Sequence, residues 1–323
     1  MDNLTAYCLS MAASLLLFWV FTWALARRNP STRFNAGILS FLEVTLGLIF
    51  GLLGAKLTFF LIRLTYLLNL KNSDFFLTLR PEELSFFGGA AGFVLGVWLS
   101  AKILNMSSRA VLNAFAPAGA FLVAAARFSE YFLGLLGAGD YLEEITLPIP
   151  MSFPFVIGID FSGDGSYVEY YWAIFMLECL VALVIMVVSL CHRKDPRRFT
   201  RTVFYLCLCQ VFLESLRSTS ITWLFVRVEQ LLCFLICEGI LVFRAIRYRN
   251  VKGAWIPPVV GLVVCALIVG IEFALDKTAI PHSVLYGVMA AALAGLGIAE
   301  ALGVRALPPL ASDDTPASSP GRT

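Results

Sequence analysis

The chain has 323 residues, of which 59% are hydrophobic and only 14% are charged, and its mean hydropathy is +0.83. A soluble domain has roughly 45–50% apolar and about 25% charged residues, so these values exclude an ordinary soluble protein. The net charge is only +2, with the basic residues mostly in short loops, so no nucleic acid is expected as a partner.

Cysteine and histidine give no sign of a metal site or a disulfide framework. The eight cysteines include no C-x-x-C pair, and four of them lie within apolar runs, where cysteine behaves as a small hydrophobic residue. The two histidines, His192 and His282, both fall at predicted helix ends. We therefore expect neither a metal nor a cofactor, and a Ser-His-Asp or Cys-His mechanism within the membrane is not favoured.

Apolar stretches recur along the chain at the length that a bilayer requires, which is roughly 17–25 residues per helix. They predict an all-α integral membrane protein, a bundle of about nine transmembrane helices with a small cap outside the membrane. The predicted spans are residues 4–26, 40–66, 86–104, 111–133, 168–190, 201–217, 223–243, 254–275 and 283–304.

Alternate loops differ in charge. The loops after the first, third, fifth and seventh spans are rich in arginine and lysine, whereas the opposite loops carry only Lys71, Arg80 and Lys277. By the positive-inside rule, the N-terminus is predicted outside and the C-terminus in the cytoplasm.

The longest predicted outside segment, residues 134–167, holds five acids and no lysine or arginine. Its proline and glycine density and its short β-branched runs predict a small cap of strands and turns. Residues 306–323 are predicted to be a disordered polar tail.

Two pairs of ionisable residues lie inside predicted spans. Arg127 and Glu130 belong to the fourth span, and Glu214 and Arg217 belong to the sixth. Each pair is separated by three residues, which places both members on one helix face. An ionisable residue in a membrane helix costs several kcal/mol unless it is paired or faces water, so the four predict a functional site. The alternative is that each pair only neutralises itself and holds helices together.

Other polar side chains in the spans are also expected to be buried: Lys56 and Arg63 in the second, and Arg227, Glu229 and Gln230 in the seventh.

The third span is rich in glycine at its outer end, with Gly88, Gly89, Gly92 and Gly96. Glycines there allow another helix or a lipid to approach the backbone, and helix packing is the commoner reason for such a pattern.

Arginines fixed inside a membrane suit the headgroup of an anionic phospholipid. Guanidinium binds phosphate in a bidentate fork and stays protonated where a lysine can lose its proton. Acids such as Glu130 and Glu214 can orient these arginines, and one of them can take a proton from an incoming nucleophile. The pattern therefore predicts a site that cleaves or moves a phosphate-linked group.

The order of short motifs resembles the prolipoprotein diacylglyceryl transferase family over roughly residues 1–245. The matching segments, in chain order, are LTAYCLSM with Tyr7, GLLGAKLTFFLI, LSFFGGAAG, APAGAFLVAAARFSEYFLG with Arg127 and Gly134, VFLESLRS, and RVEQLLCFL. The positions that keep the residue of the family motifs are Tyr7, Arg127, Glu214, Arg217 and Gln230.

The chain departs from the family pattern at five positions. Phe87 stands where the family has a histidine, Glu130 stands on the asparagine of the signature, and Leu135 stands on a later acid. Gln210 and Lys56 each stand on an arginine.

The resemblance implies transfer of a diacylglyceryl group from phosphatidylglycerol, or a related anionic phospholipid, to a cysteine thiol of a lipoprotein precursor. It also implies a bacterial cytoplasmic membrane. On this hypothesis Arg127 and Arg217 bind phosphate, and Glu214 orients one of them. Because Phe87 cannot serve as the family histidine does, Glu130, one turn from Arg127, is the candidate for a substitute base. Tyr7 would donate a hydrogen bond to the lipid, unless it only anchors the helix at the interface. The remaining residues expected to bind lipid or substrate are Gly88, Gly89, Gln210 and Gln230.

The resemblance divides the chain into a seven-helix core over residues 1–250, two further transmembrane helices over 251–305, and the tail. Two other functions stay open at this stage. One is a descendant without catalysis that binds phospholipid or a membrane partner, which the lost family residues favour. The other is a transporter for an anionic solute, although the chain shows no clear internal repeat.

Overall fold

The computed structural model describes residues 3–64, 80, 83–139, 154–193, 195–217, 222–223, 226–278 and 280–305. Within these ranges the chain forms nine α-helices, each corresponding to one predicted span. They are α1 (Asn3–Arg28), α2 (Ala36–Ile62), α4 (Phe86–Ile103), α5 (Ser108–Ser129), α6 (Ile174–Cys191), α7 (Arg198–Ser215), α8 (Val228–Arg247), α9 (Ile256–Lys277) and α10 (His282–Arg305).

Seven of the described helical segments are long and apolar enough to cross a membrane: those of α1, α2, α4, α5, α6, α9 and α10. Helices α7 and α8 are not among them because each carries more charged side chains, including Glu214 in α7 and Glu229 in α8. The predicted all-α membrane protein is therefore confirmed, with two helices that are more polar than the rest.

The structure corrects the start of two predicted spans. Residues 168–172 form a strand, β2 (Val168–Trp172), so the fifth helix begins only at Ile174. Likewise, β3 (Thr222–Trp223) and β4 (Val226–Arg227) precede α8, which begins at Val228. Both stretches are rich in aromatic and β-branched residues, which are apolar enough to pass for helix but favour a strand.

The predicted cap contains an antiparallel hairpin of β1 (Val156–Asp160) and β2. The Asp160 carboxylate closes its turn by accepting backbone N–H bonds from Ser162, Gly163 and Gly165. Hydrogen bonds from the serine hydroxyls at positions 162 and 166 lower the pKa of Asp164 to about 2. Residues 140–153 of the cap segment and the tail 306–323 lie outside the described residues.

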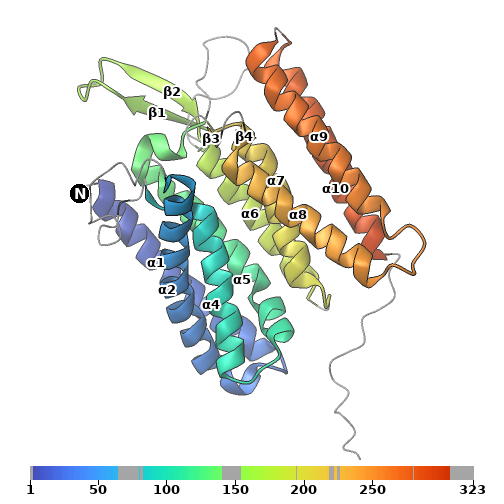
Figure 1. Ribbon diagram of the computed structural model, residues 1–323. Coiled ribbons are helices and arrows are strands. Elements are labelled where there is room, and N and C mark those ends of the chain that lie inside the picture. Colours follow the sequence, from blue (N-terminus) through green and yellow to red (C-terminus); the bar gives the residue numbers. More distant parts are fainter. Residues whose placement is uncertain are drawn as a thin grey trace, which may run out of the picture. The chain divides into compact units, whose positions relative to one another are not determined.

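The chain divides into two compact units, Met1–Ile236 and Cys237–Thr323. In the first unit, α2 packs against α4 and α1 against α5, and the hairpin lies at the end where α1 begins (Figure 1). Its apolar core includes Phe18, Phe93 and Phe115, one from each of α1, α4 and α5, with ring centroids 5.3–6.2 Å apart. In the second unit, α9 packs against α10, and Arg244 forms a 2.8 Å ion pair with the fully buried Glu300.

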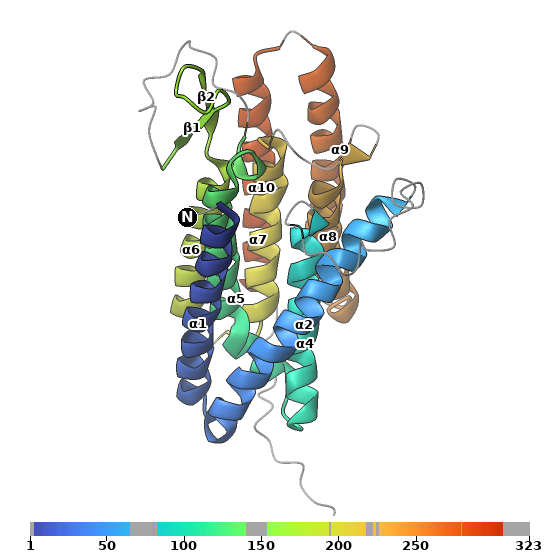
Figure 2. The same ribbon diagram turned by 90° about the vertical axis from the view of Figure 1, so that its left-hand side faces the viewer.

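Helices α2 and α4 pack tightly where they cross, and Figure 2 shows α2 running obliquely over α4. A Cβ atom added at Gly92 would lie 2.0 Å from the carbonyl oxygen of Phe50, and one added at Gly96 would lie 2.5 Å from the amide nitrogen of Gly47. The glycines at positions 92 and 96 therefore serve helix packing. The first turn of α4 is fixed by a cap, in which the Ser85 hydroxyl accepts a hydrogen bond from the backbone N–H of Gly88.

We expect Gly92→Ala to lower the free energy of unfolding by about 1–3 kcal/mol, because the new methyl group meets a backbone atom that cannot move aside. Gly89→Ala, in the same helix, is the matched control, since its Cβ would lie 3.6 Å from its nearest neighbour, Ala55. Thermal and denaturant unfolding in detergent would measure both. Equal losses at the two positions would contradict the close helix contact.

Candidate functional site

Two arginines and two glutamates form a closed ring of ion pairs inside the first unit. Arg127, at the end of α5, places its Nη1 atom 2.6 Å from Oε1 of Glu130 and its Nε atom 3.1 Å from Oε2 of Glu178 in α6. Arg217, just beyond α7, lies 2.6 Å from Glu130 and 2.8 Å from Glu178. Each arginine therefore contacts both glutamates, and each glutamate contacts both arginines. We call these four residues the ion-pair ring.

The ion-pair ring is largely removed from solvent. The side chains of Arg127 and Glu178 are each 2% exposed, and those of Arg217 and Glu130 are 10% and 15% exposed. Buried charges are tolerated only when they are paired and hydrogen-bonded. Two positive and two negative groups in alternation satisfy this condition, so the ring carries no net charge of its own.

Irregular backbone that follows α5 and α7 holds the ring in place. Glu130 begins the 3-10 segment η3 (Glu130–Gly137), in which Gly134 has φ +61°, a conformation that glycine adopts readily. Arg217 pairs with Gly139 through an isolated β-bridge. Arg227 of β4 donates hydrogen bonds to the backbone carbonyls of Glu214 and Arg217. These contacts fix the two segments that follow α5 and α7.

Two glutamines connect the ring to α7 and α8. Gln210 donates to Glu178 at 2.7 Å and to Glu214 at 3.2 Å, so its amide bridges two carboxylates. Gln230 donates to the carbonyl of Val211 at 3.1 Å and to the hydroxyl of Ser215 at 2.8 Å. Gln210 therefore belongs to the surroundings of the ring, whereas Gln230 fastens the start of α8 to α7.

Arg127 keeps one side of its guanidinium available. Its Cζ atom lies 3.8 Å from the centroid of the Phe86 ring, a cation–π contact that orients the group. Its Nη2 atom is buried and has no hydrogen-bond partner among the residues that the structure describes. A buried donor without an acceptor is costly, so this atom marks a place where an acceptor oxygen of a ligand is expected.

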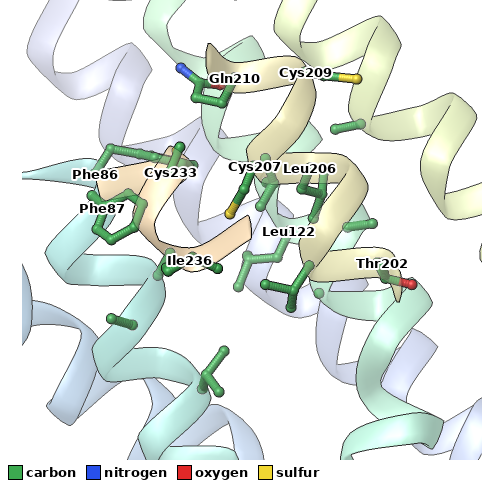
Figure 3. A pocket seen from close by; sticks show the side chains of 18 of the residues that line it. Phe86, Phe87, Leu122, Thr202, Leu206, Cys207, Cys209, Gln210, Cys233 and Ile236 are labelled. Carbon is green, nitrogen blue, oxygen red and sulfur yellow. The ribbon is translucent and has the colours of Figure 1, made fainter. Parts of the chain in front are cut away.

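Two cavities adjoin the ring. The polar cavity, of about 330 Å³, is lined by Arg127, Glu130, Arg217 and Glu214 together with Tyr7. The apolar cavity, of about 400 Å³, is lined by α4, α5, α6, α7 and α8, and Figure 3 shows Phe87, Leu122, Cys207 and Cys233 around it. Both fall in the size range of ligand sites in proteins. Phe86 and Glu229 line both cavities.

The structure brings together the four residues that the sequence singled out, but with different pairing. Arg127, Glu130 and Arg217 are in the ion-pair ring, while Glu214 lies beside it and accepts from Gln210. Among the described residues, Glu214 forms no ion pair with an arginine, and the place expected for it beside the arginines is occupied by Glu178.

Sequence reasoning missed Glu178. It has no charged neighbour three or four residues away in α6, so a search for pairs on one helix face passes over it. The available signal was its isolation, because it is the single charged residue in the apolar helix IFMLECLVALVIMVVSLC.

The other polar and glycine residues that the sequence singled out differ in whether they lie at the site. Tyr7 and Gly89 line the polar cavity, whereas a Cβ atom at Gly88 would meet the backbone of α2, so Gly88 serves packing. Lys56, on the position of a family arginine, pairs with Glu83 at 2.7 Å and does not join the ring. Arg63 was wrongly expected to be buried, since it is exposed at the end of α2.

Within the described parts of the chain, no group of three or more His, Cys, Asp and Glu side chains is arranged to hold a metal ion. The polar side chains at the site are arginines, carboxylates, amides and a phenol.

Comparison with known families adds an independent finding. The family model described as prolipoprotein diacylglyceryl transferase matches residues 2–245, which cover the ring, both cavities and α8 up to its last turn. The match confirms the resemblance that the motifs indicated. A comparison with curated proteins gave no match.

We expect Glu178→Gln to lower the free energy of unfolding by about 3–5 kcal/mol, because it leaves two buried arginines sharing one carboxylate. Asp195→Asn is the matched control, since it alters a single ion pair outside the ring, with Arg201 of α7, and should cost less than opening the ring. Unfolding in detergent would measure both variants. A loss at position 178 as small as that at position 195 would contradict the role given to the ring.

Proposed function

The chain belongs to the prolipoprotein diacylglyceryl transferase family, and we propose that it transfers a diacylglyceryl group from phosphatidylglycerol to a cysteine thiol of a lipoprotein precursor. A closely related transfer from another anionic phospholipid is included in this proposal. The observation that carries it is the ion-pair ring beside a cavity of about 330 Å³, with the buried Nη2 donor of Arg127 lacking a partner among the described residues.

The ring is better suited to bind a phosphate ester at short range than to attract an anion from a distance. Because its arginines are already balanced by Glu130 and Glu178, the site attracts an anion weakly at long range but offers fixed donors at short range. Donors that are in place before the reaction stabilise charge that develops in the transition state. Here that charge would develop on the phosphate oxygen that leaves the glycerol carbon.

The apolar cavity supports a substrate with acyl chains. Its walls are mostly aromatic, aliphatic and cysteine side chains from α4, α5, α6, α7 and α8, and its polar members are Thr202, Gln210 and two acids. A phospholipid combines a phosphate with long apolar chains, and the two cavities together offer both environments.

A second candidate function is binding of anionic phospholipid, or of a membrane partner, without catalysis. Phe87, on the position of the family histidine, lines the apolar cavity, where a phenyl ring cannot accept a proton. This observation favours the second function unless another residue supplies the base.

We expect Arg127→Ala and Arg127→Lys each to reduce transfer about 10²–10³-fold. Alanine removes the guanidinium group, and the ammonium group of lysine cannot reproduce its planar fork of donors. The assay would supply labelled phosphatidylglycerol and a peptide with a lipobox cysteine to purified protein in vesicles. Arg33→Lys, at an exposed position in η1 (Arg33–Asn35), is the control and should keep full activity. Full activity of Arg127→Lys would contradict bidentate phosphate binding. Absence of transfer by the wild type, with lipid still bound, would favour the binding function.

We also propose that the N-terminus and the β1–β2 hairpin lie outside the cytoplasmic membrane of a bacterium, with the C-terminus in the cytoplasm. The charge difference between alternate loops supports this orientation.

The orientation predicts how two exposed positions react with a membrane-impermeant maleimide in intact cells. Ser162→Cys in the hairpin should be labelled at once, whereas the native Cys191 at the end of α6 should react only after permeabilisation. Each would be measured in a background where the other exposed cysteines are serine. The reverse labelling pattern would contradict the proposal and indicate the opposite orientation.

A further inference from the structure

Glu229 is an acid of the site that takes part neither in the ion-pair ring nor in the proposed binding of phosphate. It is the second residue of α8 and lines both the polar and the apolar cavity. Among the residues that the structure describes, its carboxylate has no hydrogen bond and no ion pair. It therefore stands where a ligand in either cavity can reach it.

The neighbours of Glu229 in the chain hold it in this position. Arg227 donates to the backbone carbonyl of Glu214, and Gln230 donates to the carbonyl of Val211 and the hydroxyl of Ser215. The start of α8 is thus fastened to α7 on both sides of Glu229. An acid in the first turn of a helix is common because the helix dipole favours it, but that does not explain why this acid faces two cavities.

The other carboxylates of the site are occupied. Glu130 accepts from two arginines at 2.6 Å, so adding a proton to it would break two buried ion pairs. Glu178 is bound by both arginines and by Gln210, and Glu214 accepts from Gln210. Glu229 can take up a proton without breaking a contact of this kind, which makes it the better candidate for a base than Glu130.

We propose that Glu229 is the general base of the transfer and takes the proton of the acceptor thiol, in place of the missing histidine. This proposal rests on the proposed function. The acceptor sulfur forms a bond to the glycerol carbon that bears the phosphate, and the bond from that carbon to the phosphate oxygen breaks. Its electron pair leaves with glycerol phosphate, held by Arg127 and Arg217, and the thiol proton passes to the carboxylate of Glu229.

The charges around Glu229 come from α5, α6, α7 and the segment that follows α7. They are Glu214 of α7, Arg127 of α5, Glu178 of α6, and Arg217 beyond α7. Two are positive and two are negative, so replacing Glu229 by a neutral residue leaves these four balanced. A variant at this position therefore tests the proton acceptor with little change in the charges that hold the phosphate.

The test compares wild type, Glu229→Gln and Glu229→His in the transfer assay between pH 6 and about 9.5. At neutral pH we expect Glu229→Gln to lose about 10²–10⁴-fold in rate, as the loss of a general base does, while binding of labelled phosphatidylglycerol stays unchanged. Its rate should then rise with pH until the acceptor thiol ionises near its usual pKa of about 8.5, because a thiolate needs no base. Glu229→His should recover part of the neutral rate.

Glu238→Gln is the matched control, because it removes a second carboxylate of α8 that has no hydrogen-bond partner among the described residues, outside the site. It should transfer at the wild-type rate. A wild-type rate for Glu229→Gln would overturn the proposal, as would a loss that stays constant across the pH range or that is matched by loss of lipid binding. Absence of transfer by wild type that binds the lipid would instead contradict the proposed function and remove this step with it.

Discussion

The rest of the site depends on the burial of two guanidinium groups in the interior of a membrane protein. Neither Arg127 nor Arg217 can shed its charge, so each needs carboxylates within contact distance. One carboxylate, Glu130, comes from the segment that continues α5, and the other, Glu178, comes from a different helix. Because the ring closes only when three parts of the chain meet, it couples the positions of α5, α6 and the segment after α7. The β-bridge between Gly139 and Arg217 fixes that meeting point.

Neutralising the arginines has a second effect, which concerns the division of roles among the acids. A carboxylate that holds an arginine in place cannot also accept a proton without weakening the site. Structural and catalytic duties therefore fall to different residues: Glu130 and Glu178 serve the ring, while Glu229 stays accessible from both cavities. Seen in this way, the phenylalanine at position 87 need not end catalysis, because the proton acceptor can approach from α8 instead of α4.

Much of this arrangement could be predicted from the sequence, and the rest could not for physical reasons. Apolar length predicted every described helix, and the spacing of Arg127 and Glu130 predicted their contact, because both are local properties of the chain. The contact of Glu178 with both arginines depends on how separate helices meet, which no local spacing encodes. The strands before α6 and α8 were assigned to the helices because hydropathy does not separate a short apolar strand from the end of a membrane helix.

The backbone contact between α2 and α4 determines which wall of the polar cavity can yield. Gly51 of α2 and Gly89 of α4 line that cavity, and the two helices meet too closely at Gly92 for either to slide without breaking the contact. The two helices therefore form a rigid wall of the cavity. Helix α1 also lines the cavity, contributes Tyr7 and exposes many of its large apolar side chains. A lipid with two acyl chains would therefore enter more easily past α1, so the speed of substrate entry would depend on how readily α1 moves against α5 and α2, on which it packs.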